Sequence, residues 1–258
     1  MVEVIGVALP NATAIHSKVS MVKYGPYPLH IVVMDITNWT RLCYEAKQAN
    51  RFDAIAEGFR IFVAEAYQAE LQVRVNPCRR PDKFPLARES EDSELVDPTV
   101  DIANHTGDGF ILLCSNAEMT LDFARKLRDN AFRALVDCLK ASHICSADDV
   151  ELRLAIHSGD VWTILSSESQ AAEEQFAMGD FYFSEAINLA SRLVTSDFCR
   201  AASTRAICTE EFRQCLPEKY GPLFGQPHEL RGRKDGDEER DIDYPTNVHV
   251  HEIFGEPK

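Results

Sequence analysis

Two aspartates of this sequence stand where short apolar segments end. Asp35 directly follows the apolar run from His30 to Met34, and Asp108 lies between two glycines in Thr106-Gly107-Asp108-Gly109. If the two segments form neighbouring strands, both carboxylates reach the same edge of a sheet. Two carboxylates held close together repel each other unless a cation lies between them, which is how such pairs hold Mg²⁺ or Mn²⁺ in phosphoryl chemistry. The alternative for either aspartate is that it only caps a turn.

A second pair of polar residues lies on an otherwise apolar helix. Asn188 and Arg192 are four residues apart, and this spacing places them on one face of the helix. An amide beside a guanidinium suits a ribose or phosphate oxygen on which charge develops. The alternative is an exposed polar stripe without a ligand.

Periodicity and turn residues predict the elements that position these side chains. The order predicts an α/β (α+β) sandwich with a mostly antiparallel sheet and helices on one side, whose remaining face or edge could pair with a second subunit. The charged segment 76–97 is expected to be a loop insertion. Strands are expected at His30–Met34, Val100–His105, Phe110–Cys114, Leu152–Ile156, Val161–Leu165, Ala206–Thr209, Glu229–Arg231 and Val248–Phe254, and helices from Asn38, over Phe52–Leu71, Ala117–His143 and Ser184–Leu193, and before Leu216.

Composition excludes several classes of protein. The 258 residues carry 27 Lys and Arg against 41 Asp and Glu, a net charge of −14, which argues against binding polymeric nucleic acid. No apolar run reaches the roughly 18 residues that a membrane-spanning helix needs, so no membrane partner is expected. The eight cysteines form no CxxC pair, which favours free thiols in a reducing compartment, and we expect a cytoplasmic protein.

Four segments together resemble the signature blocks of class III nucleotidyl cyclase catalytic domains, in that family's order. The resemblance implies the ferredoxin-like class III cyclase fold, with a catalytic domain over 29–258 after an N-terminal extension at 1–28. The blocks are Met34-Asp35-Ile36 with Trp39-Thr40, Thr106-Gly107-Asp108-Gly109-Phe110, Leu152-Arg153-Leu154-Ala155-Ile156-His157-Ser158-Gly159, and Ile187-Asn188-Leu189-Ala190-Ser191-Arg192-Leu193.

The resemblance also implies a homodimer whose active sites are each lined by both chains. By similarity, Asp35, Asp108 and the backbone carbonyl of Ile36 of one chain would bind two divalent ions, Mg²⁺ or Mn²⁺. From the other chain, Asn188 would orient the ribose and Arg192 would stabilise the transition state. The ribose 3′-oxygen of a nucleoside triphosphate would attack the α-phosphate and expel pyrophosphate.

A triphosphate tail needs a further cation, which this family usually places in a Lys-Gly pair near the terminal hairpin. The matching stretch here is Leu230-Arg231-Gly232-Arg233-Lys234, in which Arg231 fits the role best and Lys234 second. The alternative for each is a solvent-facing basic cluster.

The positions that read the base in this family are unusual here. Adenylate cyclases carry a lysine and an aspartate where gap-free counting gives Asn104 and Phe181, and the guanylate cyclase glutamate is also missing at the first position. Aromatic bulk would shrink the site toward a one-ring base, and Asn104 could pair with a pyrimidine edge. Arg41 and Tyr44 are further candidates for base contact, although Tyr44 could instead be a core residue.

Because it lacks the purine-reading residues, the chain resembles the pyrimidine cyclases of the Pycsar antiphage defence system. The resemblance implies a uridylate cyclase that converts UTP to cyclic UMP, a second messenger that activates a separate effector protein. The alternatives are a cytidylate cyclase and an adenylate or guanylate cyclase whose base-reading residues lie elsewhere in the irregular segment 175–187. A different class is a catalytically idle cyclase-like module that binds nucleotides.

Overall fold

Strand β2 is the centre of a mixed, mostly antiparallel sheet. The computed structural model describes residues 4–6, 20–75, 100–105, 109–144, 149–166, 181–232 and 241–255. In these residues a nine-stranded sheet runs in the order β3-β4-β2-β5-β7-β9-β8, with β1 paired to β2 and β6 to β5, and only β5 and β7 are parallel. The strands are β1 Val4–Gly6, β2 Ser20–Ile36, β3 Val100–His105, β4 Gly109–Cys114, β5 Leu152–Ser166, β6 Phe181–Phe183, β7 Ala206–Thr209, β8 His228–Leu230 and β9 Val248–Glu252.

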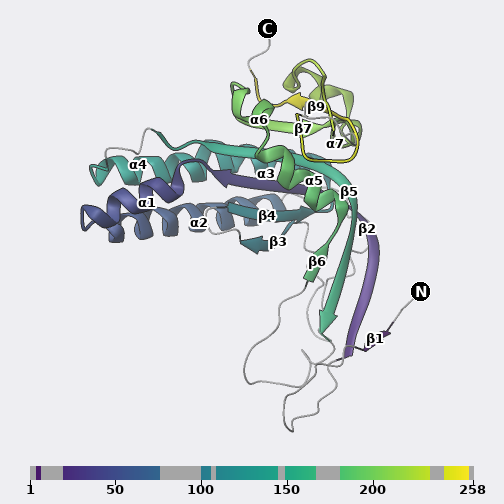
Figure 1. Cartoon of the computed structure of the whole chain (residues 1–258), viewed down its shortest axis with the longest axis horizontal. Coiled ribbons are helices and arrows are strands. Elements are labelled where there is room, and N and C mark those ends of the chain that lie inside the picture. The colour runs from purple at the N-terminus through teal and green to yellow at the C-terminus, as the bar shows by residue number, and fades with distance from the viewer. Residues whose placement is uncertain are drawn as a thin grey trace.

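Helices cover both faces of this sheet, whereas the sequence analysis expected them on one side (Figure 1). The α2–α4 layer packs on Val32 and Met34, and α5 packs on Ile31 and Val33. Because consecutive residues of a strand point to opposite faces, the unbroken apolar run in β2 serves two helical layers. The helices are α1 Trp39–Gln48, α2 Phe52–Val75, α3 Ala117–Lys126, the π-helical turn η1 Leu127–Phe132, α4 Arg133–Ala141, α5 Glu185–Val194, α6 Asp197–Ala201, α7 Glu210–Gln214 and the 3₁₀ helix η4 Glu218–Leu223.

The sequence predicts two strands, Leu152–Ile156 and Val161–Leu165, joined by a turn at His157-Ser158-Gly159-Asp160; this is wrong, because all of these residues lie inside the single strand β5. This strand pairs with β2 from Ile36 opposite Leu152 to Met21 opposite Ser166. Gly159 is required by helix packing rather than by a turn, since a Cβ atom there would lie 2.6 Å from the Cβ of Ala186 on α5. Figure 1 shows β2 and β5 running together beyond the helical layers.

The two strands expected at Val100–His105 and Phe110–Cys114 are present as β3 and β4. Strands β3 and β4 are antiparallel, with His105 opposite Phe110. The turn residues 106–108 lie outside the described residues, as do most of segment 1–28 and the 76–97 insertion. Strand β2 already begins at Ser20, within the segment expected to be an extension.

The remaining helices follow their apolar patterns. The helix expected over Ala117–His143 is present as α3, η1 and α4 in direct succession. Its buried residues include Phe123, Leu127, Leu135 and Leu139, whose spacing of four or a multiple of four places them along one face. No helix in the described ranges is long and apolar enough to cross a membrane.

Candidate active site

Asp35 lies near the end of β2, between two neighbouring strands. It is opposite Gly109 of β4 on one side and opposite Arg153 of β5 on the other. Alternation along β2 places Asp35 on the sheet face of Ile31 and Val33, which is the face that α5 covers. The half-buried carboxylate therefore lies at the end of the central strand, on the face that α5 covers, and the strand that follows Asp108 in the sequence starts directly opposite it.

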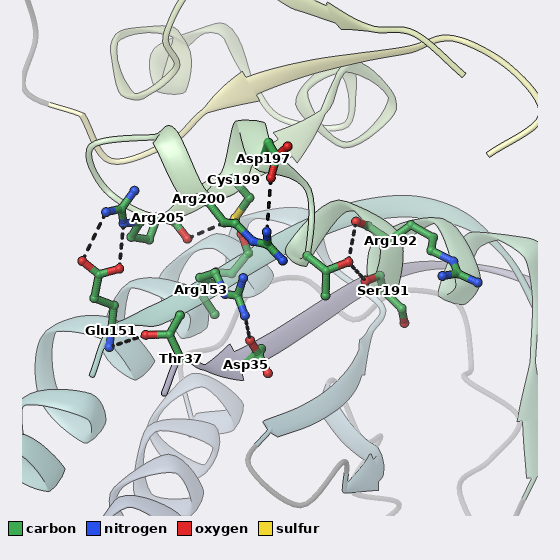
Figure 2. A network of polar contacts seen from close by, with 12 residues as sticks. Asp35, Thr37, Glu151, Arg153, Ser191, Arg192, Asp197, Cys199, Arg200 and Arg205 are labelled. Atoms are coloured by element: carbon green, nitrogen blue, oxygen red, sulfur yellow. Dashed lines mark hydrogen bonds and ion pairs between the residues drawn. The ribbon is translucent and has the colours of Figure 1, made fainter. Parts of the chain in front are cut away.

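The Asp35 carboxylate forms an ion pair with Arg153, a residue to which the sequence analysis assigned no role. The Nη2 of Arg153 donates to Oδ2 of Asp35 (Figure 2). The side chains are 12% and 23% exposed, respectively, and the buried Nε of Arg153 has no hydrogen-bond partner among the described residues. Only the strand register could have revealed this pair, because the two residues are 118 positions apart.

The backbone immediately after Asp35 and Ile36 is held by a second polar network (Figure 2). The N–H of Thr37 donates to the carbonyl of Glu151 at 2.8 Å, and the N–H of Glu151 donates to Oγ1 of Thr37 at 2.9 Å. Arg205 donates to both carboxylate oxygens of Glu151, at 3.0 and 3.2 Å. The backbone after Ile36 is thus held by Glu151, the residue before β5, and the carboxylate of Glu151 is held in turn by Arg205, the residue before β7.

Helix α1 begins directly after this network. Asn38 precedes the helix with φ of 58°, and its side-chain amide donates to the carbonyl of Asp149 at 2.7 Å rather than capping the helix. Of the two base-contact candidates on α1, Arg41 donates to Glu45 at 2.8 Å, a bond that raises the pKa of the guanidinium. Tyr44 is 64% exposed, so the alternative of a core residue is wrong.

Helix α5 presents Asn188 and Arg192 to solvent. The helix is capped by Ser184, whose hydroxyl accepts from the N–H of Ala186 at 2.9 Å, while Leu189 and Leu193 are buried against the sheet. Both polar residues are exposed. Figure 2 shows the Arg192 guanidinium directed away from the Asp35 carboxylate of its own chain.

The candidate for the triphosphate cation, Arg231, lies just after β8 and is held by Asp241. Its Nε is 3.2 Å from Oδ2 of Asp241, and its backbone N–H donates to the same oxygen at 2.8 Å. These bonds lower the pKa of Asp241. The Arg231 side chain remains 54% exposed. Lys234 lies outside the described residues.

The two base-reading positions are placed by their backbones. Asn104 lies on β3 opposite Ile111, just after an irregularity in the pairing, and Phe181 lies on β6 opposite Ile164. The side chains of Asn104 and Phe181 are outside the described part of the structure.

The candidate metal ligands among the described residues offer hard oxygen donors, which would fit Mg²⁺ or Mn²⁺. Asp35 would contribute a carboxylate and Ile36 a backbone carbonyl, whereas Asp108 lies outside the described residues. In the described ranges no three His, Cys, Asp or Glu side chains converge into a metal-binding group. Such a site fits Mg²⁺, which is commonly bound by one or two carboxylates together with substrate phosphates.

Comparisons with solved structures identify the fold. The chain is similar to the guanylyl cyclase Cya2 with a TM-score of 0.54 and 11% identity over 90% of this chain and 94% of that one. It is also similar to the guanylate cyclase domain of RhGC from Catenaria anguillulae in complex with GTP, with a TM-score of 0.50 and 12% identity over 92% and 99% of the chains. A bacterial light-regulated adenylyl cyclase matches with a TM-score of 0.53 and 10% identity over 91% of this chain and 56% of that chain.

No protein-family model matches the sequence, and no curated protein matches it significantly. The structural likeness nevertheless shows the mixed sheet with flanking helices that is shared by guanylyl and adenylyl cyclase domains. The class III nucleotidyl cyclase fold that the four sequence blocks predicted is therefore confirmed.

Proposed function

We propose that this protein is a nucleotidyl cyclase that forms a 3′,5′-cyclic nucleotide and pyrophosphate from a nucleoside triphosphate. The observation that carries the proposal is the position of Asp35 in a cyclase fold. Asp35 lies opposite Gly109, which is the residue that follows Asp108 in the sequence. Asp108 directly precedes Gly109 in the sequence, which is why the proposal assigns it to the same site as Asp35.

The two carboxylates would hold the divalent ions, with the Ile36 carbonyl as a further ligand. Bound there, Mg²⁺ or Mn²⁺ would activate the 3′-oxygen and neutralise the leaving pyrophosphate. Arg153 supplies the positive charge that compensates Asp35 in the absence of an ion. Once Asp35 binds a divalent ion, the Arg153 guanidinium would be available to phosphate oxygens, which a guanidinium can bind with two parallel hydrogen bonds.

The orientation of α5 supports a composite active site in a homodimer. Asn188 and Arg192 are exposed, and Arg192 points away from Asp35 of the same chain (Figure 2). A two-fold related copy would bring these side chains to the Asp35 of the partner, and symmetry would generate two such sites. Asn188 would then orient the ribose, and Arg192 would stabilise charge that develops on the phosphate only in the transition state.

For the substrate, we propose a pyrimidine nucleotide, with UTP ahead of CTP. The support is the sequence at the two positions that read purines in the family, where Asn104 and Phe181 stand. Two of the similar structures are described as complexes with GTP and with ATPαS, so the pyrimidine assignment rests on the sequence of this chain alone. Cyclic UMP would act as a second messenger on a separate effector in antiphage defence, in the cytoplasm.

The proposal is tested by four separate incubations of the purified protein with Mn²⁺, each containing one nucleotide: ATP, GTP, CTP or UTP. We expect cyclic UMP and equimolar pyrophosphate from UTP. Cyclic CMP would change the pyrimidine assignment, and a purine product would refute it while leaving the cyclase assignment intact. A protein that binds nucleotides and forms no cyclic product from any of the four would be the idle module instead.

A further inference from the structure

The first residue of α5 shares a helix face with the two candidate catalytic residues. Glu185, Asn188 and Arg192 follow one another at spacings of three and four residues. These spacings place their side chains along one stripe of an α-helix. All three residues are exposed. A contact made at Glu185 therefore borders the face that carries Asn188 and Arg192.

Glu185 receives a hydrogen bond from the segment that follows Arg231. The hydroxyl of Tyr244 donates to Oε1 of Glu185 at 2.6 Å, across 59 positions of sequence. Burial, together with this bond, raises the pKa of Tyr244 above its usual range, so the hydroxyl is protonated and acts as the donor. The bond ties α5 to residues 241–247 from a different part of the chain.

The same segment determines where Arg231 lies. The backbone N–H groups of Asp241 and Ile242 both donate to the carbonyl of Arg231, at 3.0 and 3.2 Å, and Asp241 accepts from the Arg231 side chain. Ile242 is buried in the cluster that contains the apolar face of α5. The N–H of Tyr244 donates to the carbonyl of Ile242 at 3.0 Å. A short, continuous series of contacts thus connects Arg231 to Glu185.

We propose that Tyr244 is a positioning residue whose hydrogen bond to Glu185 holds Arg231 at a fixed place relative to Asn188 and Arg192. This inference rests on the proposed function, in which Arg192 acts at the α-phosphate and Arg231 at the triphosphate tail. One triphosphate can satisfy both guanidiniums only if the distance between them matches its length. If both guanidiniums are already held at this distance before the substrate binds, less conformational entropy is lost on binding and on reaching the reactive geometry.

Inorganic tripolyphosphate, which has the length of the substrate tail and no sugar or base, tests this inference by calorimetric titration in Mg²⁺. We expect Tyr244→Phe and Glu185→Ala each to weaken binding about tenfold, equivalent to 1.4 kcal/mol. The double variant should bind as either single variant does, because both remove the same bond. Glu185→Gln should bind almost as the wild type, since its amide oxygen still accepts from the hydroxyl.

A second tyrosine–glutamate pair provides a matched control. The hydroxyl of Tyr220 donates to Oε2 of Glu118 at 2.8 Å, between η4 and α3. Tyr220→Phe should leave tripolyphosphate binding unchanged, and all variants should keep the wild-type melting temperature within a few degrees.

Three results would overturn the positioning role: wild-type affinity in Tyr244→Phe, equal weakening in Tyr220→Phe, or no tripolyphosphate binding by the wild type. The expected binding pattern in a protein that forms no cyclic nucleotide would refute the proposed function and leave the Tyr244 inference standing.

Discussion

Arg153 and Asp35 face each other across two antiparallel strands, with the guanidinium of Arg153 donating to the carboxylate of Asp35. The pair is mostly buried, with exposures of 12% and 23%, so water screens it less than it would a surface pair. A divalent ion that binds Asp35 must compete with this internal cation. If Asp35 binds the metal as proposed, the strength of metal binding in the absence of nucleotide depends on Arg153.

The first prediction concerns this competition. Arg153→Met removes the competing charge, so we expect Mn²⁺ to bind about tenfold more tightly without nucleotide. Cyclisation should fall in the same variant, because the guanidinium no longer reaches the phosphates. Free Mn²⁺ is measured by electron paramagnetic resonance. Arg200→Met, which removes an exposed ion pair with Asp197, is the control. Unchanged Mn²⁺ affinity in Arg153→Met would show that the two cations do not compete for Asp35.

The second prediction concerns the contact between β5 and α5. Gly159→Ala places a methyl group 2.6 Å from the Cβ of Ala186, where neither atom can move away by rotation of a side chain. We expect the free energy of unfolding in urea to fall by about 1 to 3 kcal/mol. Gly221→Ala should have little effect, because nothing lies within 4 Å of its added Cβ atom. Equal stability of the two variants would mean that α5 is not packed as closely as described.

The third prediction is a dependence of stability on pH. Burial lowers the pKa of His30 from 6.5 to about 4. The folded protein therefore keeps this imidazole neutral between these pH values, whereas the unfolded chain binds a proton. Stability contributed by neutral His30 is complete above pH 6.5 and decreases as the pH falls toward 4.

The size of this effect is about 2 to 3 kcal/mol between pH 7 and pH 4.5. Urea unfolding is measured at both pH values and at one protein concentration. Between pH 7 and pH 4.5, the free energy of unfolding should decrease less for His30→Gln than for the wild type. In the control variant His249→Gln, which changes an exposed histidine, the free energy of unfolding should decrease as much as in the wild type. If His30→Gln and the wild type decreased equally, His30 would not be the group responsible.

Local patterns in the sequence were sufficient to predict much of this architecture. The apolar run ending at Asp35, the β3–β4 hairpin and the amphipathic α5 each depend on residues close together in the chain, where periodicity is informative. The same patterns predict that Asn188 and Arg192 share one face of a helix, and in the structure they do so on α5, where both are exposed.

Features that depend on register or on contacts between distant segments could not be predicted in this way. Gly159 has the sequence pattern of a turn, but its lack of a side chain accommodates Ala186. His157 lies between the two strands expected from the sequence, but it is only 8% exposed because β5 continues past it. The Arg153–Asp35 pair and the Tyr244–Glu185 bond join residues that only the folded chain brings together.

The most direct test of the account is complementation between Asp35→Ala and Arg192→Ala subunits that are co-expressed with different tags. Each variant alone should be inactive, because every site lacks one group. At equal expression, half of the dimers are mixed and each has one intact site of two, so we predict about a quarter of the wild-type cyclase activity. Activity no greater than that of the single variants would contradict a site that is shared between two chains.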